Sequence, residues 1–201
     1  MKYQVSTNVA PFGMSFLLSI SFGNMEWTSQ QKSLLEFVKK KHGDQKRKYT
    51  GAPYWTHLVA VATIVKPYAP EGVEIALCHD LFEDTSCGEE ELLSLLTEAG
   101  YTNEKANMIL HGALELTDQF VPENYPELNR KERKKREAVR LGEISALAQT
   151  VKYADLIDNS SSIIKEDPGF ARIYLSEKQD ILNVMRAGNP TLLKRCEKII
   201  D

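Results

Sequence analysis

Apolar residues recur at helical spacing from residue 28 onward, and no stretch alternates between apolar and polar residues for long enough to predict a strand. From residue 53 onward the prolines fall in or beside the breaks of this pattern. The chain is therefore predicted to be all-α. The expected helices run over about 28–41, 54–66, 71–83, 88–99, 103–117, 126–140, 143–165, 168–187 and 190–200.

The segment that precedes this pattern holds a short apolar run, MSFLLSISF, at residues 14–22. The run is too short to cross a bilayer, and its flanks match poorly the basic start and small-residue cleavage site of a secretory signal. Met25 opens the first amphipathic stretch. We expect an N-terminal extension over residues 1–24 and one domain over residues 25–201, since no repeat or low-complexity linker indicates a second domain.

The bulk composition narrows the class of protein. With 201 residues, 42% of them hydrophobic, the chain is long enough to bury a core without disulfide staples. Its formal charge of -3 gives no general attraction to nucleic acid or to a membrane surface, so neither is an expected partner. The three cysteines show no CxxC spacing and suggest neither a disulfide framework nor a thiolate zinc site. A reducing, cytoplasmic setting is the expectation.

The strongest charge run is NRKERKKREAVR, residues 129–140, in which seven lysines or arginines accompany two glutamates. Such a run usually forms a solvated helix face. No aromatic residue is interleaved with it, which disfavours a nucleic-acid-binding arm. Electropositive support for a phosphorylated small molecule is the better functional interpretation, although the chain has no GxxxxGK[ST] or GxGxxG loop to cradle phosphates.

The stretch EIALCHDLFEDTS, residues 74–86, is apolar enough for a buried helix but carries four polar groups that resist burial. At about 100° per residue these side chains fall within an arc of about 140°, opposite an apolar face. For an isolated helix a solvated stripe would explain that arc equally well. The four residues are His79, Asp80, Glu83 and Asp84.

A second stretch, TVKYADLIDNSSSI at residues 150–163, places Lys152, Asp155 and Asn159 on one helix face through spacings of three and four. An aspartate within an otherwise apolar helix is costly to bury unless it meets a cation, and a divalent metal would supply one. Mixed imidazole and carboxylate ligands favour Mn²⁺, Fe²⁺ or Zn²⁺ over Ca²⁺ without choosing among the three.

A further histidine would complete such a ligand set. His57 begins the strongly apolar helix of GAPYWTHLVAVA, a position where a histidine is more often satisfied by protein groups than by a metal. His42 lies in a basic loop, and His111 lies on an ordinary amphipathic helix. His57 is therefore the preferred candidate of the three.

Four blocks in this order resemble the HD metal-dependent phosphohydrolases, and among them the hydrolase domain of RelA/SpoT proteins and the stand-alone small alarmone hydrolases. The resemblance covers about residues 29–187. It rests on HGDQKRKYTGAPYWTH, similar to H-x-x-Q-x-R-K…G-x-P-Y-x-x-H, and on CHDLFEDT, similar to H-D-x-x-E-D-T. It also rests on LELTD at residues 114–118 and on VKYADLIDN, similar to V-K-x-A-D-x-x-x-N. The fold implied is a single helical bundle with a metal site between its helices.

The resemblance implies roles for particular residues. One divalent ion, commonly Mn²⁺, with Fe²⁺ or Zn²⁺ as the other candidates, would be held by His57, His79, Asp80 and Asp155. Catalysis would use Glu83 and Asp84 to activate or position water. Substrate would be bound by Arg47 and Lys48 in the nucleotide pocket and by Asn159 near the base or ribose.

The reaction implied is hydrolysis of the 3′-pyrophosphate of ppGpp or pppGpp to GDP or GTP and pyrophosphate. Departures from the family pattern put the base specificity in doubt, because Leu58 stands where the family usually has proline and Leu156 where it has a basic residue. The alternatives are an HD phosphohydrolase acting on an adenine alarmone, a dNTP or a nucleoside monophosphate, and a nucleotide-sensing module without turnover. The intact Glu83–Asp84 pair argues against a pure sensor.

Overall fold

The computed structural model describes residues 26–200, with side chains to residue 199, so the proposed extension over residues 1–24 lies outside the described part of the chain. The described part is helical, and its β structure is limited to an isolated bridge between Lys46 and Pro53, which confirms the all-α prediction. The elements are α1 Ser29–His42, α2 Trp55–Val65, the 3-10 helix η1 Pro70–Gly72, α3 Val73–Cys78, α4 Leu81–Asp84, α5 Glu89–Glu98, α6 Asn103–Leu116, α7 Arg130–Leu141, α8 Ala146–Glu166, α9 Pro168–Val184 and α10 Pro190–Ile200.

Side-chain caps set where several helices begin. Thr28 caps α1, with its hydroxyl accepting from the Gln31 backbone N–H at 3.1 Å. Asn129 forms a capping box at the start of α7. The cap fixes Arg130 as the first residue of this helix, which therefore begins later than the predicted start near residue 126.

The expected continuous helix over residues 71–83 is also wrong, since α3 and α4 are separated by a turn at His79 and Asp80. The backbone of Asp80 has φ -101° and ψ 4°, outside helical geometry. The His79 ring donates from Nδ1 to the Ala76 carbonyl at 2.7 Å, a carbonyl that the Asp80 N–H would use in an unbroken helix. The single helical-wheel arc drawn through the four polar residues therefore does not describe the structure.

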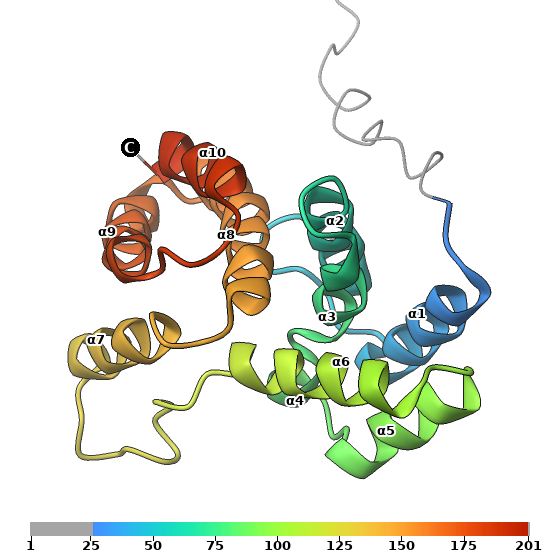
Figure 1. Ribbon diagram of the computed structural model, residues 1–201. Helices are drawn as coiled ribbons and strands as arrows, with labels where there is room; N and C mark the ends of the chain where they lie inside the picture. The colour runs from blue at the N-terminus through green and yellow to red at the C-terminus, as the bar shows by residue number, and fades with distance from the viewer. Residues whose placement is uncertain (1–25, 201) are drawn as a thin grey trace, which may run out of the picture.

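Helix α8 lies in the middle of the molecule, where it packs against α2, α3, α6, α9 and α10 (Figure 1). Tyr153 in its centre is fully buried and donates to the Met185 carbonyl at 2.7 Å. That carbonyl directly follows α9, which ends at Val184 rather than near residue 187 as predicted. The core around α8 thus also positions the C-terminal helices.

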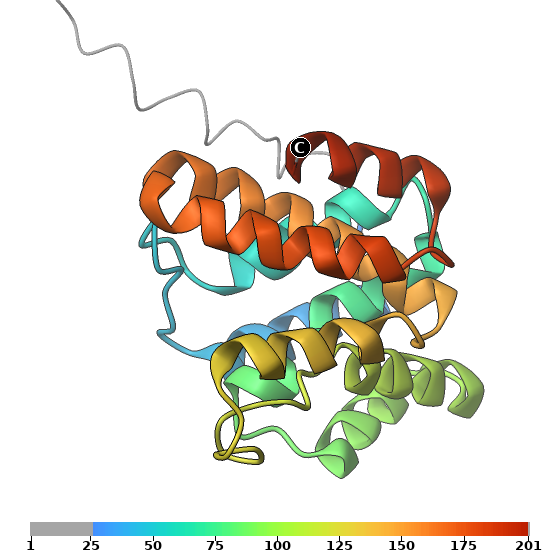
Figure 2. The same ribbon diagram turned by 90° about the vertical axis from the view of Figure 1, so that its left-hand side faces the viewer.

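Two groups of helices flank this centre (Figures 1 and 2). Helices α1, α3, α5 and α6 pack together on one side, and α7, α9 and α10 lie on the other. Helix α6 comes close to α3 at Gly112, where a Cβ would lie 2.4 Å from Ile75 Cδ1, so a larger residue would require the Ile75 side chain to shift. Within residues 26–200, no helix has both the length and the apolar character needed to cross a membrane.

Candidate active site

Two buried histidines meet between the flanking groups of helices. His57 is in the first turn of α2, and His79 lies in the turn that follows α3. Their side chains are 2% and 1% exposed, and their Nε2 atoms lie 3.3 Å apart. Neither His42 nor His111 belongs to this cluster, so the choice of His57 from the three candidates matches the geometry.

Two carboxylates converge on the same point. Asp155 of α8 places Oδ1 3.2 Å from His57 Nε2 and 3.8 Å from His79 Nε2. Asp80 places Oδ2 3.1 Å from His79 Nε2 and 3.6 Å from His57 Nε2. The compact group that can hold a metal ion consists of His57, His79 and Asp155, with ligand atoms within 4.8 Å of one another. Asp80 lies beside it.

The donor set of this cluster fits a divalent cation. His79 donates from Nδ1 to a backbone carbonyl, and His57 Nδ1 lies 2.7 Å from Asp158 Oδ2, an oxygen that accepts. In its neutral form each ring therefore turns the lone pair of Nε2 toward the other ring and toward the carboxylates. Lone pairs facing one another at this distance need a positive charge between them, and imidazole plus carboxylate is a ligand set for transition metals.

The pKa values of the imidazoles indicate the same demand for positive charge. Burial alone would lower the pKa of His79, but the carboxylates of Asp80 and Asp155 raise it well above its usual range. Burial would likewise lower the pKa of His57, but hydrogen bonds to Asp155 and Asp158 raise it above its usual value. The surrounding carboxylates thus favour a cationic centre, which either imidazolium protons or a divalent ion can supply.

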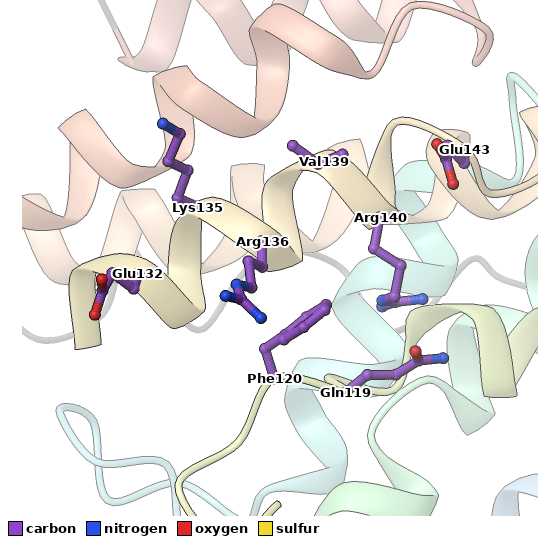
Figure 3. A pocket seen from close by; sticks show the side chains of 8 residues that line it. All are labelled: Gln119, Phe120, Glu132, Lys135, Arg136, Val139, Arg140 and Glu143. Atoms are coloured by element: carbon purple, nitrogen blue, oxygen red, sulfur yellow. The ribbon is translucent and has the colours of Figure 1, made fainter. Parts of the chain in front are cut away.

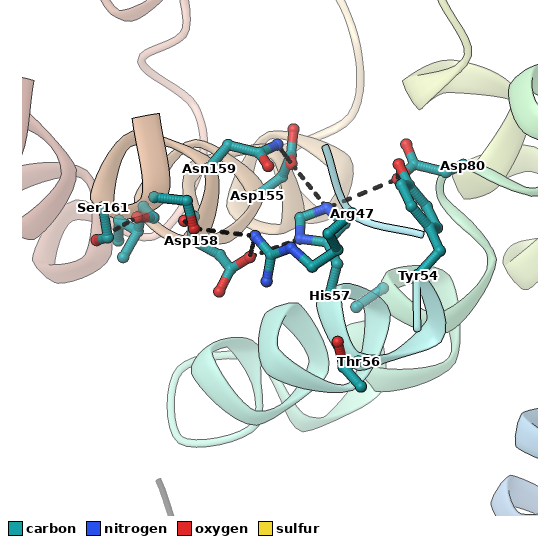
Figure 4. Close-up of polar contacts among 12 residues, drawn as sticks. Arg47, Tyr54, Thr56, His57, Asp80, Asp155, Asp158, Asn159 and Ser161 are labelled. Carbon is teal, nitrogen blue, oxygen red and sulfur yellow. Dashed lines mark hydrogen bonds and ion pairs between the residues drawn. The ribbon is translucent and has the colours of Figure 1, made fainter. Parts of the chain in front are cut away.

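Each candidate carboxylate ligand is itself held in place (Figure 4). Tyr54 donates to Asp80 Oδ2 at 2.7 Å. Asp155 receives the amide of Asn159 on Oδ1 at 2.6 Å and pairs through Oδ2 with Lys152 Nζ at 2.9 Å. Sequence reasoning assigned no role to Tyr54, although it is the tyrosine of the G-x-P-Y-x-x-H block. Asn159, expected near a base or ribose, contacts the candidate ligand and also lines the adjoining cavities.

The proposed catalytic pair lies on the single turn α4 and is tethered from two directions. The backbone N–H of Asp118 donates to Glu83 Oε1, and Gln45 Nε2 donates to Asp84 Oδ2 at 3.1 Å. Gln45 is in turn 2.7 Å from His42 Nδ1, so His42 supports this side chain from the buried end of α1. Partial desolvation by the surrounding protein and the negative charge of Asp118 raise the pKa of Glu83 to about 7.

A cavity of about 170 Å³ adjoins the histidine cluster, with Asp80, Glu83 and Asp155 among its lining residues. Asp118 and Glu137 line it as well, and its positive charge comes from lysines of three helices. They are Lys134 of α7, Lys152 of α8 and Lys178 of α9. Converging cations beside a candidate metal centre suit the phosphate groups of a substrate.

The three lysines differ in their partners. Lys134 Nζ pairs with Asp118 Oδ2 at 2.7 Å, and Lys152 pairs with Asp155. Lys178 forms no ion pair with any carboxylate of the part of the chain that the structure describes, and its Nζ lies 4.8 Å from the centre of the Tyr174 ring. Burial and the neighbouring Lys152 ammonium lower the pKa of Lys178 to about 8. Lys178 is therefore the lysine of this cavity whose ammonium group is not already paired with a described carboxylate and can bind a ligand.

The predicted substrate-binding lysine and arginine line a second cavity, of about 140 Å³, on the other side of His57. Arg47 crosses to α8, with Nη2 2.6 Å from Asp158 Oδ2 and 3.2 Å from Ser162 Oγ (Figure 4). Lys48 Nζ lies 5.0 Å from the centre of the Tyr49 ring. Tyr54 and Asn159 line both this cavity and the cavity of about 170 Å³ that holds the three lysines, called the lysine cavity below. The two cavities therefore meet at the histidine cluster.

A larger cleft, of about 580 Å³, lies on α7 away from this cluster (Figure 3). Lys135, Arg136 and Arg140 line it together with Phe120. Arg140 is already paired with Glu137, and no residue of the predicted site lines the cleft. The basic run of the sequence therefore contributes one side chain, Lys134, to the cavity beside the cluster and forms a separate surface with most of the others.

Comparison with known proteins agrees with this geometry. No protein-family model matches the chain. A 59-residue segment is 46% identical to the guanosine-3′,5′-bis(diphosphate) 3′-pyrophosphohydrolase of Aquifex aeolicus (strain VF5). That match spans 28% of this chain and 8% of the curated relative.

Among solved structures, the chain is similar to the protein described as a metazoan ortholog of SpoT that hydrolyzes ppGpp and plays a role in starvation responses. The TM-score is 0.70 at 23% sequence identity, and the likeness covers 87% of this chain and 96% of that one. At this identity the likeness shows a shared helical fold. The curated match is to a guanosine-3′,5′-bis(diphosphate) 3′-pyrophosphohydrolase and the structural match shares the helical fold, and both agree with the resemblance drawn from the four sequence blocks.

Proposed function

We propose that this protein is a metal-dependent hydrolase that removes the 3′-pyrophosphate of the guanosine alarmones ppGpp and pppGpp, giving GDP or GTP and pyrophosphate. The observation that carries the proposal is the convergence of His57, His79 and Asp155 on one point, beside a cavity lined by lysines and by Glu83. The chain is similar to two proteins whose descriptions name ppGpp hydrolysis, and this similarity supports the choice of substrate.

We assign the metal ligands as His57, His79, Asp80 and Asp155, and Mn²⁺ as the first ion to test, with Fe²⁺ and Zn²⁺ next. When bound, such an ion would act as a Lewis acid toward a phosphate oxygen and lower the pKa of water. The protein's own contribution is orientation, since Tyr54 holds Asp80 and Lys152 holds Asp155.

Glu83 and Asp84 are assigned to water activation and positioning. With a pKa near 7, the Glu83 carboxylate is deprotonated in about half the molecules at neutral pH and can accept a proton from an attacking water. Asp84, held by Gln45, completes the pair on α4. The lysines of the lysine cavity would neutralise the transferred phosphates, and Lys178 is the one among them that pairs with no carboxylate of the described residues.

The cavity around Arg47 and Lys48 is assigned to the remainder of the nucleotide. Arg47 supplies charge and a planar surface that can stack on a base, and Tyr49 offers an aromatic ring beside it. We also infer a reducing, cytoplasmic setting, because all three cysteines are buried as free thiols.

The experiment that tests the proposal uses protein stripped with a chelator and reconstituted with Mn²⁺. Its substrates are ppGpp, pppGpp, the adenine analogue, dNTPs and nucleoside monophosphates, and the products are separated by chromatography. We expect pyrophosphate release to be fastest from a guanosine alarmone and absent in excess chelator. Equal turnover with chelator would defeat the metal mechanism, faster turnover of another nucleotide would replace the substrate, and nucleotide binding without turnover would indicate a sensor.

A further inference from the structure

Asp158 of α8 joins two parts of the candidate site that are far apart in the sequence. One of its oxygens, Oδ2, lies 2.7 Å from His57 Nδ1 and 2.6 Å from Arg47 Nη2. The same atom therefore accepts from an imidazole and from a guanidinium. Figure 4 shows Asp158 between these two side chains.

The geometry leaves each of the three side chains little freedom. The Asp158 side chain is 16% exposed, that of Arg47 is 15% exposed and that of His57 is 2% exposed. Arg47 also donates from Nη2 to Ser162 Oγ at 3.2 Å, one turn further along α8. Arg47 and Asp158 form a charge pair at 2.6 Å in which both side chains are largely shielded from water, so the guanidinium is held by an opposite charge that solvent screens little.

Resting on the proposed function, we propose that Asp158 is a positioning residue with two simultaneous tasks. It holds the proton of His57 on Nδ1, which keeps Nε2 available as a metal ligand. It also fixes the Arg47 guanidinium at the wall of the nucleotide cavity before substrate arrives. The metal centre and the nucleotide cavity are thereby supported by a single carboxylate oxygen.

Substitutions can separate the two tasks. In Asp158→Asn the amide oxygen still accepts from His57 Nδ1–H, but the side chain has no charge to hold Arg47. In Asp158→Ala both tasks are lost. In Arg47→Ala only the nucleotide side is lost, while Ser162→Ala is the matched control because it removes a contact to Arg47 without touching His57.

The first measurement is Mn²⁺ affinity without any nucleotide, by electron paramagnetic resonance of the free ion. We expect the Kd for Mn²⁺ to rise about 10- to 100-fold in Asp158→Ala. It should stay within about threefold of wild type in Asp158→Asn, Arg47→Ala and Ser162→Ala, because the imidazole keeps its acceptor in all three. A wild-type Kd in a folded Asp158→Ala protein would overturn the proposal, as would a tenfold loss of affinity in Ser162→Ala.

The second measurement is KM, with the nucleotide that is turned over fastest. Asp158→Asn and Arg47→Ala should each raise KM about tenfold with kcat little changed, and the double variant should match Arg47→Ala alone because both act through one guanidinium. Independent, multiplying effects would overturn the coupling. If Asp158→Ala fails to fold, the Asn variant still tests this step.

The metal measurement needs no substrate, so it distinguishes failure of this proposal from failure of the proposed activity. If the protein shows the expected Mn²⁺ affinities in all variants but does not hydrolyse ppGpp, the role of Asp158 stands and only the assigned substrate is wrong. A chain that hydrolyses ppGpp with an unchanged Mn²⁺ Kd in Asp158→Ala would retain its function and lose this role for Asp158.

Discussion

Two concentrations of charge in this molecule behave in opposite ways. The basic run on α7 is local, with seven cations in twelve consecutive residues, and most of its side chains lie at the surface. The histidine cluster takes single residues from α2, the turn after α3, and α8, and buries them. The cluster carries fewer charges but leaves them facing one another. Convergence of buried groups, rather than density of charge along the chain, therefore marks the site.

The difference follows from solvation. Water screens exposed lysines and arginines at little cost, so a run such as that of α7 needs no ligand to be stable. A buried aspartate or imidazole must find a partner, and the partners found here are other site residues, among them the Lys152 ammonium that pairs with Asp155. Lys134 is instructive because it belongs to the basic run, yet its side chain reaches the cavity beside the cluster.

The largest effect is expected from removing a buried ligand. Asp155→Ala should abolish Mn²⁺ binding and turnover together, because Asp155 supplies negative charge at the point where both imidazoles meet. Metal content by elemental analysis and kcat on the same preparation measure the effect. The matched control is Asp180→Ala, an exposed aspartate of α9, which should keep both. Full metal content in Asp155→Ala would remove it from the ligand set.

The next effect concerns the pair on α4. Glu83→Gln and Asp84→Asn should keep the metal while kcat falls by roughly two orders of magnitude, since each keeps its size and loses its charge. Because the pKa of Glu83 is near 7 and the base must be deprotonated, kcat/KM of the wild type should rise with pH through that value. Glu83→Gln should lack this rise. A pH profile unchanged by the substitution would assign the proton acceptor to another group.

A smaller effect is expected at the lysine cavity. Lys178→Met keeps the length of the side chain but removes the one cavity lysine without a carboxylate partner among the described residues. The loss of one charge-assisted contact to phosphate should raise KM about tenfold and leave Mn²⁺ affinity unchanged. Steady-state kinetics and metal titration test this. A KM equal to that of the wild type would show that Lys178 serves packing against Tyr174 only.

The smallest effect is expected at the surface of α7. Lys135 and Arg136 line the separate cleft. Lys135→Gln and Arg136→Gln should change KM and kcat by less than about twofold at physiological salt, because salt screens exposed charges that lie outside the site. Kinetics at low and high salt provide the check. A KM increase as large as that of Lys178→Met would mean that this cleft, too, belongs to the substrate-binding surface.

The sequence predicts some of these features well, for physical reasons. Helical periodicity identifies the fold class, because a helix must bury one face whatever its neighbours are. The spacing of Lys152, Asp155 and Asn159 along α8 correctly predicts that they share a face. The same spacing could have identified Asp158, three residues beyond Asp155, whose carboxylate would otherwise have looked like a solvated charge.

Other features leave weaker signals in the sequence. The helix breaks at His79 and Asp80 because the His79 imidazole donates to the Ala76 carbonyl in place of the Asp80 backbone N–H. Scales of helix propensity do not include such a side-chain hydrogen bond. Lys178 lies on an amphipathic helix of ordinary composition, and only the packing of α9 against α7 and α8 brings it to the cavity. The helix break is therefore a local contact between a side chain and the backbone, and the placement of Lys178 is a tertiary one; helix propensity gives neither.

The proposed ligand positions have a consequence for the stability of the whole protein. His57 and Asp155 are 98 residues apart in the chain, and they belong to helices packed at the centre of the fold. An ion held by both would bind the folded chain far better than the unfolded one, so each tenfold rise in free ion above the Kd would add about 1.4 kcal/mol to the free energy of unfolding. The metal would then act as a reversible cross-link, and the supply of the ion in the cell would regulate how long the protein survives as well as how fast it works.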